Sequence, residues 1–187
     1  MDSITGIILA GGESKRMGID KNLVIYKEKR LIEYPIGLLQ KFCNNIILSS
    51  EPDKLIDYNF PKIADEKGKF GPLSGIYACL KASENQRNIV LSCDMPLISE
   101  ELINHLLQNQ DNAELVMPYC NSHYEPLCAI YNKSLIPIIE RLFEQKEYSP
   151  LSLIPISNFK KVEINSSLHF FNNQIFKNIN TLEDLSK

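Results

Sequence analysis

The sequence lacks the features that identify several large classes of protein. No apolar run approaches the ~20 residues that a transmembrane helix needs, and neither an internal repeat nor a low-complexity segment is present. The net charge is only −3, which argues against a protein that coats nucleic acid or binds a membrane surface. We therefore expect a folded protein that has neither nucleic acid nor a membrane among its partners.

Cysteine and histidine are present without the spacings that would give them a structural or catalytic role. The five cysteines are an odd number and include no C-x-x-C pair, so neither a disulfide framework nor a zinc site is expected. The three histidines show no triad pattern and no metal-ligand spacing, and no G-x-S-x-G elbow occurs. The N-terminus has no basic-then-apolar leader. Together these observations predict a reduced, cytoplasmic protein.

Length and hydrophobic patterning indicate one α/β domain over residues 1–187. The chain is 44% hydrophobic and 23% charged, which is average globular composition. Apolar runs predict strands or extended pieces at 4–10, 23–26, 45–49, 61–64, 88–93, 115–118, 127–131, 161–164 and 175–179. Helical spacing and start signals predict helices at 31–42, at 72–80, after the cap Ser99, at 135–143 and from Thr181. This alternation predicts a three-layer, Rossmann-like fold, with a mostly parallel twisted sheet and helices on both faces.

The stretch at residues 9–21, LAGGESKRMGIDK, directly follows the first predicted strand. It combines two glycines with three cations: Gly11, Gly12, Lys15, Arg16 and Lys21. Adjacent glycines let the backbone take positive φ and approach a ligand closely, and successive N–H groups in such a turn attract anions. Paired glycines alone would favour an ordinary surface turn, but their combination with these cations favours a phosphate-binding loop. Neither the G-x-G-x-x-G of dinucleotide sites nor the Walker G-K-[ST] is present.

Asp94, which follows the predicted strand 88–93, is the candidate metal ligand. Ligands of open α/β sheets bind outside the carboxyl ends of the strands, so Asp94 would face the phosphate loop if the two strands are neighbours. A single carboxylate suits Mg²⁺, with Mn²⁺ as an alternative, because Mg²⁺ is held largely by substrate phosphates and water. An Asp two residues before Pro96 would by itself indicate a turn or a helix cap. Its place after a buried strand, in a chain with this loop, favours the metal.

Four stretches, in the same order along the chain, resemble a known family. They are LAGGESKRMGIDK at 9–21, GPLSG at 71–75, CDMP at 93–96 and FKNINTLEDL at 176–185. In these stretches the sequence is similar to the molybdenum cofactor guanylyltransferases of the nucleotidyltransferase superfamily. The resemblance implies transfer of GMP from GTP to molybdopterin, with release of pyrophosphate. It also implies partnership with molybdenum-insertion and molybdoenzyme maturation proteins.

The resemblance also implies roles for individual residues. The implied catalytic residues are Arg16, Lys21 and Asp94, of which Asp94 is also the metal ligand. The implied nucleotide-binding residues are Leu9, Ala10, Gly11, Gly12, Lys21, Asp65, Gly75 and Asp94, and the implied acceptor-binding residues are Asn178 and Asn180. By themselves, Asp65, Asn178 and Asn180 would be interpreted as turn formers.

Two positions depart from the pattern of the family. Ser49 stands where the family often has Asn, and Leu182 stands where it has Pro. A hydroxyl lacks the two-sided hydrogen bonding of an amide, so Ser49 is a weak contact candidate.

Two alternative functions stay open: a cytidylyltransferase acting on molybdopterin or on a sugar or polyol phosphate, and a catalytically weak nucleotide-binding accessory protein. The GPLSG stretch and the N-x-N tail argue against the first, and Lys21 and Asp94 argue against the second.

Overall fold

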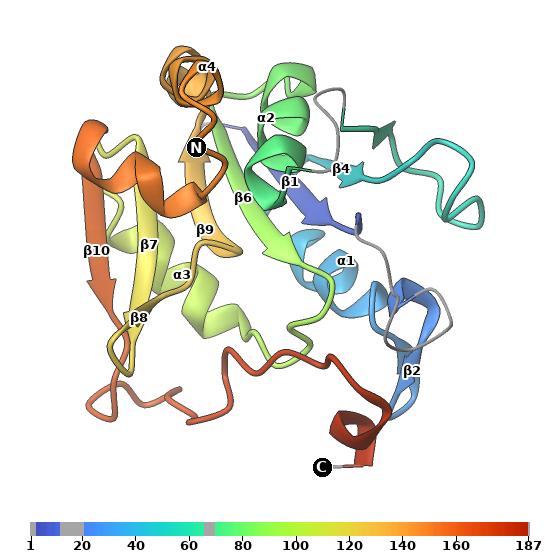
Figure 1. Ribbon diagram of the computed structural model, residues 1–187. Coiled ribbons are helices and arrows are strands. Elements are labelled where there is room, and N and C mark those ends of the chain that lie inside the picture. The colour runs from blue at the N-terminus through green and yellow to red at the C-terminus, as the bar shows by residue number, and fades with distance from the viewer. Residues whose placement is uncertain (1–2, 12–20, 66–69, 187) are drawn as a thin grey trace.

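The computed structural model describes residues 3–11, 21–65 and 70–186, which form an eight-stranded sheet and a small separate hairpin (Figure 1). The strands of the sheet are β1 (Ile4–Leu9), β4 (Asn45–Ser49), β5 (Lys62–Ile63), β6 (Arg87–Ser92), β7 (Leu115–Cys120), β8 (His123–Tyr124), β9 (Cys128–Asn132) and β10 (Phe159–Glu163). Their order is β10-β7-β9-β6-β1-β4-β5, with β8 paired to β7 beside this path. The hairpin consists of β2 (Ile25–Tyr26) and β3 (Lys29–Arg30).

The sheet is mostly parallel, as expected. β1 runs parallel to both of its neighbours, β4 and β6, and β10 runs parallel to β7. β9 is antiparallel to both β6 and β7, so it runs against the strands on either side of it. Because β1 and β6 are parallel neighbours, their carboxyl ends meet at the same edge of the sheet.

Helices cover both faces of the sheet, which confirms the predicted layers. One apolar core includes side chains of α1 (Glu33–Leu39) and α3 (Glu100–Gln108), and the other includes side chains of α2 (Pro72–Ala82) and α4 (Ile136–Glu144). Along β1, Ile8 belongs to the first core, whereas Ile7 and Leu9 belong to the second, as the two-residue period of a strand requires. The 3-10 helices are η1 (Lys21–Leu23), η2 (Lys133–Leu135), η3 (Pro150–Ile156) and η4 (Leu182–Ser186). Among the described residues, no helix is long and apolar enough to cross a membrane.

Gly6 in β1 determines how closely α1 approaches the sheet. A Cβ at Gly6 would lie 3.0 Å from Leu39 Cδ1 and 3.2 Å from Leu39 Cβ, which is tighter than ordinary contact in a close-packed interior. Leu39 is fully buried, so it has little room to move away. A glycine inside a strand therefore serves close helix packing here.

Element boundaries differ from expectation where the elements are short. The helix expected at 31–42 is shorter than predicted. It forms as α1 (Glu33–Leu39), and residues 31–32 and 40–42 are turns. The extended piece expected at 23–26 is divided between the end of η1 and β2. β8 was not expected, since two residues are too few for a periodic pattern. It pairs with β7 across a tight turn in which Asn121 and Ser122 have φ of 47° and 65°.

The prediction of a strand at 175–179 is wrong. Residues 175–176 lie in a turn, and residues 177–180 have no regular secondary structure. Ile175 is buried in the core shared with α1 and α3, and Ile179 is buried in a small core with Tyr26 of the hairpin. The two isoleucines anchor the C-terminal tail to the body of the protein by burying their side chains. Apolar residues at this spacing were therefore interpreted as a strand. The helix expected from Thr181 forms as the 3-10 helix η4.

Candidate active site

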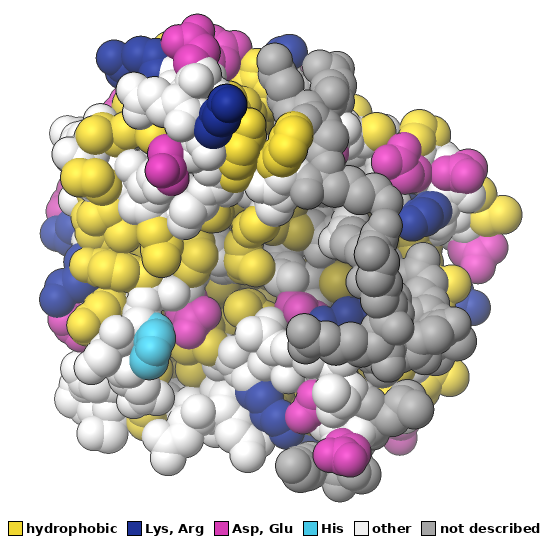
Figure 2. Space-filling model, in the orientation of Figure 1, with side chains coloured by type: hydrophobic (Ala, Val, Ile, Leu, Met, Phe, Trp, Pro, Cys, Tyr) yellow, Lys and Arg dark blue, Asp and Glu magenta, His cyan; other side chains and the backbone are white. Residues whose placement is uncertain are grey.

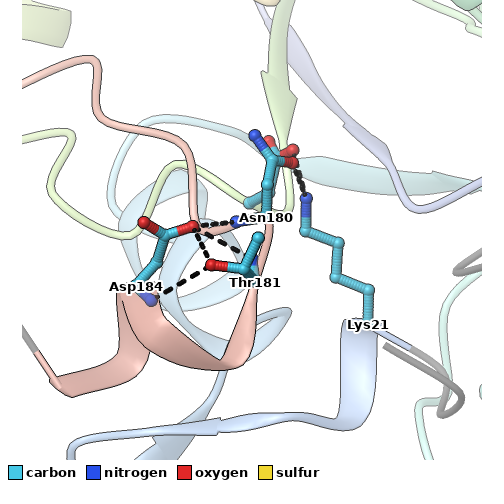
Figure 3. A network of polar contacts seen from close by, with 5 residues as sticks. Lys21, Asn180, Thr181 and Asp184 are labelled. Atoms are coloured by element: carbon cyan, nitrogen blue, oxygen red, sulfur yellow. Dashed lines mark hydrogen bonds and ion pairs between the residues drawn. The ribbon is translucent and has the colours of Figure 1, made fainter. Parts of the chain in front are cut away.

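Three polar side chains from distant parts of the chain meet near the carboxyl ends of β1 and β6. Lys21, the first residue of η1, places Nζ 2.7 Å from Asp94 Oδ2 and 2.6 Å from Asn180 Oδ1. Figure 3 shows Lys21 reaching toward Asn180, which lies in the C-terminal segment (residues 175–186). The sequence named all three as site residues, and the structure brings them together.

Ala10 and Asn22 tie η1 to the end of β1. The buried Asn22 side chain donates Nδ2–H to the carbonyl of Ala10 at 2.9 Å, which holds the neighbouring Lys21 beside the strand. The N–H of Ala10 donates to the carbonyl of Ser49 at 3.2 Å. Both backbone polar groups of Ala10 are thus bonded within the protein. Ala10 therefore fixes the start of the predicted phosphate-binding loop, and its N–H is already bonded within the protein.

Asp94 has one hydrogen-bonded and one unbonded carboxylate oxygen. Oδ2 accepts from Lys21, whereas Oδ1 is buried and has no hydrogen-bond partner in the part of the chain that the structure describes. A buried acceptor without a partner is costly, and a bound cation would satisfy it. Within the described residues, no three His, Cys, Asp or Glu side chains gather into a metal cluster. Asp94 therefore fits Mg²⁺ or Mn²⁺ that is bound mainly by phosphate and water oxygens.

Backbone and side-chain hydrogen bonds hold the C-terminal segment against Asp94. Ile179 is fully buried and donates its N–H to the carbonyl of Asp94 at 2.9 Å. Asp184 Oδ2 accepts from the N–H of Asn180 at 3.0 Å and from the N–H and Oγ1–H of Thr181, both at 2.9 Å (Figure 3). The N–H of Asp184 donates back to Thr181 Oγ1 at 3.3 Å, which completes a capping box. These hydrogen bonds, chiefly the one from Asn180, hold the pKa of Asp184 below its usual range.

A cleft of about 530 Å³ opens beside Asp94. Figure 2 shows hydrophobic side chains gathered in the hollow at the middle of this face of the molecule. The lining includes five of the residues that the sequence assigned to the nucleotide: Leu9, Gly11, Asp65, Gly75 and Asp94. The other lining residues are Ser49, Ser50, Glu51, Lys54, Gly71, Pro72, Ser92 and Leu127. Glu51 and Lys54 were missed because they stand in a polar loop after β4 that contains no motif.

Ser49 and Gly75, which both line the cleft, are in close contact. A Cβ at Gly75 would lie 2.5 Å from Ser49 Oγ and 3.6 Å from Leu9 Cδ2. Ser49 is the last residue of β4 and is 6% exposed. Its hydroxyl also contacts Cys79, where burial raises the pKa of the thiol to about 12 and the hydrogen bond with Ser49 acts in the opposite direction. β1, β4 and α2 therefore pack closely at this point of the cleft.

Some of the predicted site residues have little or no described geometry. Gly12 and Arg16 lie outside the described residues, as does the third loop cation, Lys15. Asn178 is half-buried beside the anchor Ile179. Their roles in binding or catalysis stay predictions.

Comparison with known proteins agrees with the motifs and the fold. Residues 6–155 match the family model of the MobA-like NTP transferase domain. The chain is 33% identical over 187 residues to a probable molybdenum cofactor guanylyltransferase from Flavobacterium johnsoniae, covering 100% of this chain and 96% of that protein. It also resembles the solved structure of molybdopterin-guanine dinucleotide biosynthesis protein A from Archaeoglobus fulgidus, with a TM-score of 0.79, 26% identity and coverage of 97% and 95% of the two chains.

A more distant solved structure shares the fold alone. It is Rv0371c from Mycobacterium tuberculosis in complex with manganese, with a TM-score of 0.64, 13% identity and coverage of 87% of this chain and 88% of that chain. The family model covers residues 6–155, which is most of the chain. The chain therefore belongs to the MobA-like NTP transferase family and is a nucleotidyltransferase.

Proposed function

We propose that this protein transfers GMP from GTP to molybdopterin, forming the guanine dinucleotide form of the cofactor and releasing pyrophosphate. The observation that carries the proposal is the meeting of Lys21, Asp94 and Asn180 at one end of the cleft. Nucleotidyl transfer needs a cation and a metal ligand at the phosphates, with polar groups close by for the acceptor. The family relationship, and the relative from Flavobacterium johnsoniae in particular, support the choice of substrates.

The nucleotide is proposed to occupy the cleft. Leu9 and Gly75 provide an apolar, close-fitting floor, and the carboxylate of Asp65 is an acceptor suited to ribose hydroxyls or to donors of the base. The backbone at Gly11, continued by Gly12, would hold the phosphates, since paired glycines allow close approach. Ala10 contributes by fixing the start of this loop.

The chemistry requires positioning and charge neutralisation and does not require a protein base. The acceptor phosphate is already anionic, so it can attack the α-phosphorus in line while pyrophosphate leaves. The ammonium of Lys21 and the guanidinium of Arg16 would neutralise charge that grows on the phosphates. Mg²⁺ or Mn²⁺ held at Asp94 supplies Lewis-acid neutralisation of the same charge when it is bound.

Asn178 and Asn180 are proposed to bind the acceptor. The side-chain oxygen of Asn180 accepts from Lys21, which directs its two amide N–H donors to other partners, such as the acceptor phosphate. We further propose a cytoplasmic enzyme in which residues 1–187 are a single nucleotidyltransferase domain. Its product would pass to molybdenum-insertion and molybdoenzyme maturation proteins.

Pyrophosphate release with each of the four NTPs, with and without molybdopterin, tests the proposal. We expect release that depends on GTP, on molybdopterin and on a divalent metal, and that stops with a chelator. Release that depends mainly on CTP would instead indicate a cytidylyltransferase. Tight nucleotide binding without release under any condition would indicate an accessory protein.

A further inference from the structure

The cleft wall formed by the start of α2 is not held by a capping side chain. Gly71 is the N-cap residue, has φ of 94° and makes no side-chain cap hydrogen bond. Gly71, Pro72 and Gly75 all line the cleft that we assign to the nucleotide. A capping side chain normally bonds the first N–H groups of a helix and fixes its start. Without one, the position of this wall depends on other contacts.

Phe70 and Tyr148 supply such a contact. Their rings are stacked, with centroids 4.5 Å apart and an interplanar angle of 15°. The carbonyl oxygen of Tyr148 lies 3.9 Å from the position that a Cβ on Gly71 would take. Tyr148 therefore borders both residues that lead into α2. Phe70 is 51% exposed, so this stack lies at the surface and outside the apolar core.

Aromatic side chains of α4 and α2 fix Tyr148 in turn. Phe143 of α4 has its ring centroid 5.5 Å from that of Tyr148 and 5.3 Å from that of Tyr77, which it meets edge-on at 76°. The hydroxyl of Tyr77 donates to Glu140 Oε1 at 2.8 Å. Figure 1 shows α2 and α4 side by side on the same face of the sheet. These contacts form a continuous aromatic row that runs from Phe70, just before α2, through Tyr148 and Phe143 of α4, and back to Tyr77 of α2.

We infer that Tyr148 is a positioning residue for nucleotide binding: through Phe70, it holds Gly71 and the first turn of α2 in place at the cleft. Tyr148 is not among the residues that line the cleft in the described structure, so it acts through its neighbours. The inference rests on the proposed function, because it takes the Gly71 side of the cleft as the nucleotide wall. Because about half of Phe70 is exposed to solvent, loss of the stack would let Gly71 and the start of α2 move without opening a cavity in the core.

The test compares Tyr148→Ala, Phe70→Ala, the double variant and Tyr148→Phe. The Kd for GTP with Mg²⁺ is measured by calorimetry without molybdopterin, and KM and kcat are measured in the full reaction. We expect Tyr148→Ala to raise the Kd roughly three- to tenfold, the range that an aromatic pair contributes, with kcat at saturating GTP unchanged. Tyr148→Phe keeps the ring and should bind GTP as the wild type does.

Two comparisons separate positioning from general destabilisation. Because Tyr148 acts through Phe70, the double variant should bind GTP no more weakly than either single variant, whereas independent effects would multiply. Tyr119→Ala is the control, since Tyr119 of β7 forms an aromatic pair with Tyr124 of β8, at 4.8 Å, and in the strand order β9 and β6 separate β7 from β1. Its Kd for GTP should equal that of the wild type. If Tyr148→Ala does not fold, Phe70→Ala carries the test alone, with the same expected rise in Kd.

The outcomes that overturn the inference are distinct from those that overturn the proposed function. If the wild type binds GTP and turns over, but Tyr148→Ala and Phe70→Ala bind GTP as the wild type does, only the inference fails. The same holds if the effects of the two variants multiply, or if kcat falls while the Kd stays constant. If the wild type itself binds no GTP, the proposed function and the inference fail together.

Discussion

The ammonium of Lys21 lies 2.7 Å from the carboxylate of Asp94, although the two residues are 73 positions apart in the chain. Both side chains are 18% exposed, so salt screens this ion pair less than a fully exposed pair. The pair joins the last residue of the predicted phosphate-binding loop to the candidate metal ligand. A nucleoside triphosphate and its metal would offer each group a new partner, with phosphate oxygens for Lys21 and the metal for Asp94.

Asp94→Ala should abolish metal-dependent turnover while the protein stays folded. The substitution removes the carboxylate that would anchor the metal, so we expect kcat to fall by at least about a hundredfold. Pyrophosphate release and a thermal melt are measured on the same sample. Asp111→Asn is the control, because it removes the charge of an exposed carboxylate that pairs with Lys160 at 2.8 Å, and Asn tolerates the φ of 47° at this position. Near-normal turnover of folded Asp94→Ala would refute the metal assignment.

Lys21→Ala should lower turnover more than it weakens GTP binding. Lys21 is expected to meet charge that grows at the α-phosphate, and interactions that strengthen in the transition state act on the rate. We expect kcat to fall about a hundredfold and the Kd for GTP to rise by less than about tenfold. Lys160→Ala, at an exposed ion pair, should leave both values unchanged. A higher Kd for GTP with an unchanged kcat would contradict this role.

Gly75→Ala should destabilise the protein and weaken GTP binding, and Ser49→Ala should reverse most of the loss. The added Cβ would lie 2.5 Å from Ser49 Oγ, whereas its next neighbours are at 3.6 Å, an ordinary contact. We expect Gly75→Ala to cost about 1–3 kcal/mol in unfolding free energy through overpacking. The double variant should recover nearly wild-type stability in urea titrations. If the losses of the two single variants simply add, the contact is not the cause.

Asp184→Asn should weaken binding of the acceptor and leave GTP binding unchanged. Asp184 accepts three hydrogen bonds from Asn180 and Thr181, so losing its charge loosens the segment that presents Asn180. We expect a higher KM for molybdopterin with an unchanged Kd for GTP. Glu183→Gln, the same kind of charge removal at the neighbouring exposed position, is the control. A change in the Kd for GTP that equals the change in the KM for molybdopterin would place Asp184 elsewhere in the mechanism.

The same carboxylate determines how this segment responds to pH. Because the pKa of Asp184 is lower in the folded protein, its stabilising effect is complete above the unfolded pKa of about 4 and is lost as the pH falls through the folded value. Proteolysis of the C-terminal segment should therefore not change between neutral pH and about pH 5, and should increase at lower pH. In Asp184→Asn this dependence should disappear.

The interior of the fold was predictable because buried strands appear as continuous apolar runs. β4 was expected at 45–49 and forms over Asn45–Ser49, and Ser99 caps α3 by accepting from the N–H of Leu102. The sequence could not show whether the C-terminal segment is a strand or a loop. Its apolar residues Ile175 and Ile179 pack into the cores of the protein without forming a strand. Two-residue strands such as β8 carry too little pattern to be recognised.

The candidate site was predictable where a residue follows a strand end or belongs to a motif. Asp94 and Gly75 were predicted in this way, and both line the cleft. The contact of Ser49 with Gly75 and the stack of Phe70 on Tyr148 depend on how the elements pack. No local pattern in the sequence records such distances.

The central claim is guanylyl transfer, and competition between GTP and CTP at equal concentration, with molybdopterin as acceptor, tests it most directly. Guanine offers N1–H and N2–H donors and an O6 acceptor, whereas cytosine has a different edge and is one ring smaller. In a cleft shaped for guanine, cytosine would leave buried polar groups unpaired at roughly 1–3 kcal/mol each. Two such losses predict that the guanine dinucleotide exceeds the cytosine dinucleotide by on the order of a hundredfold. A product mixture dominated by the cytosine dinucleotide would contradict the account.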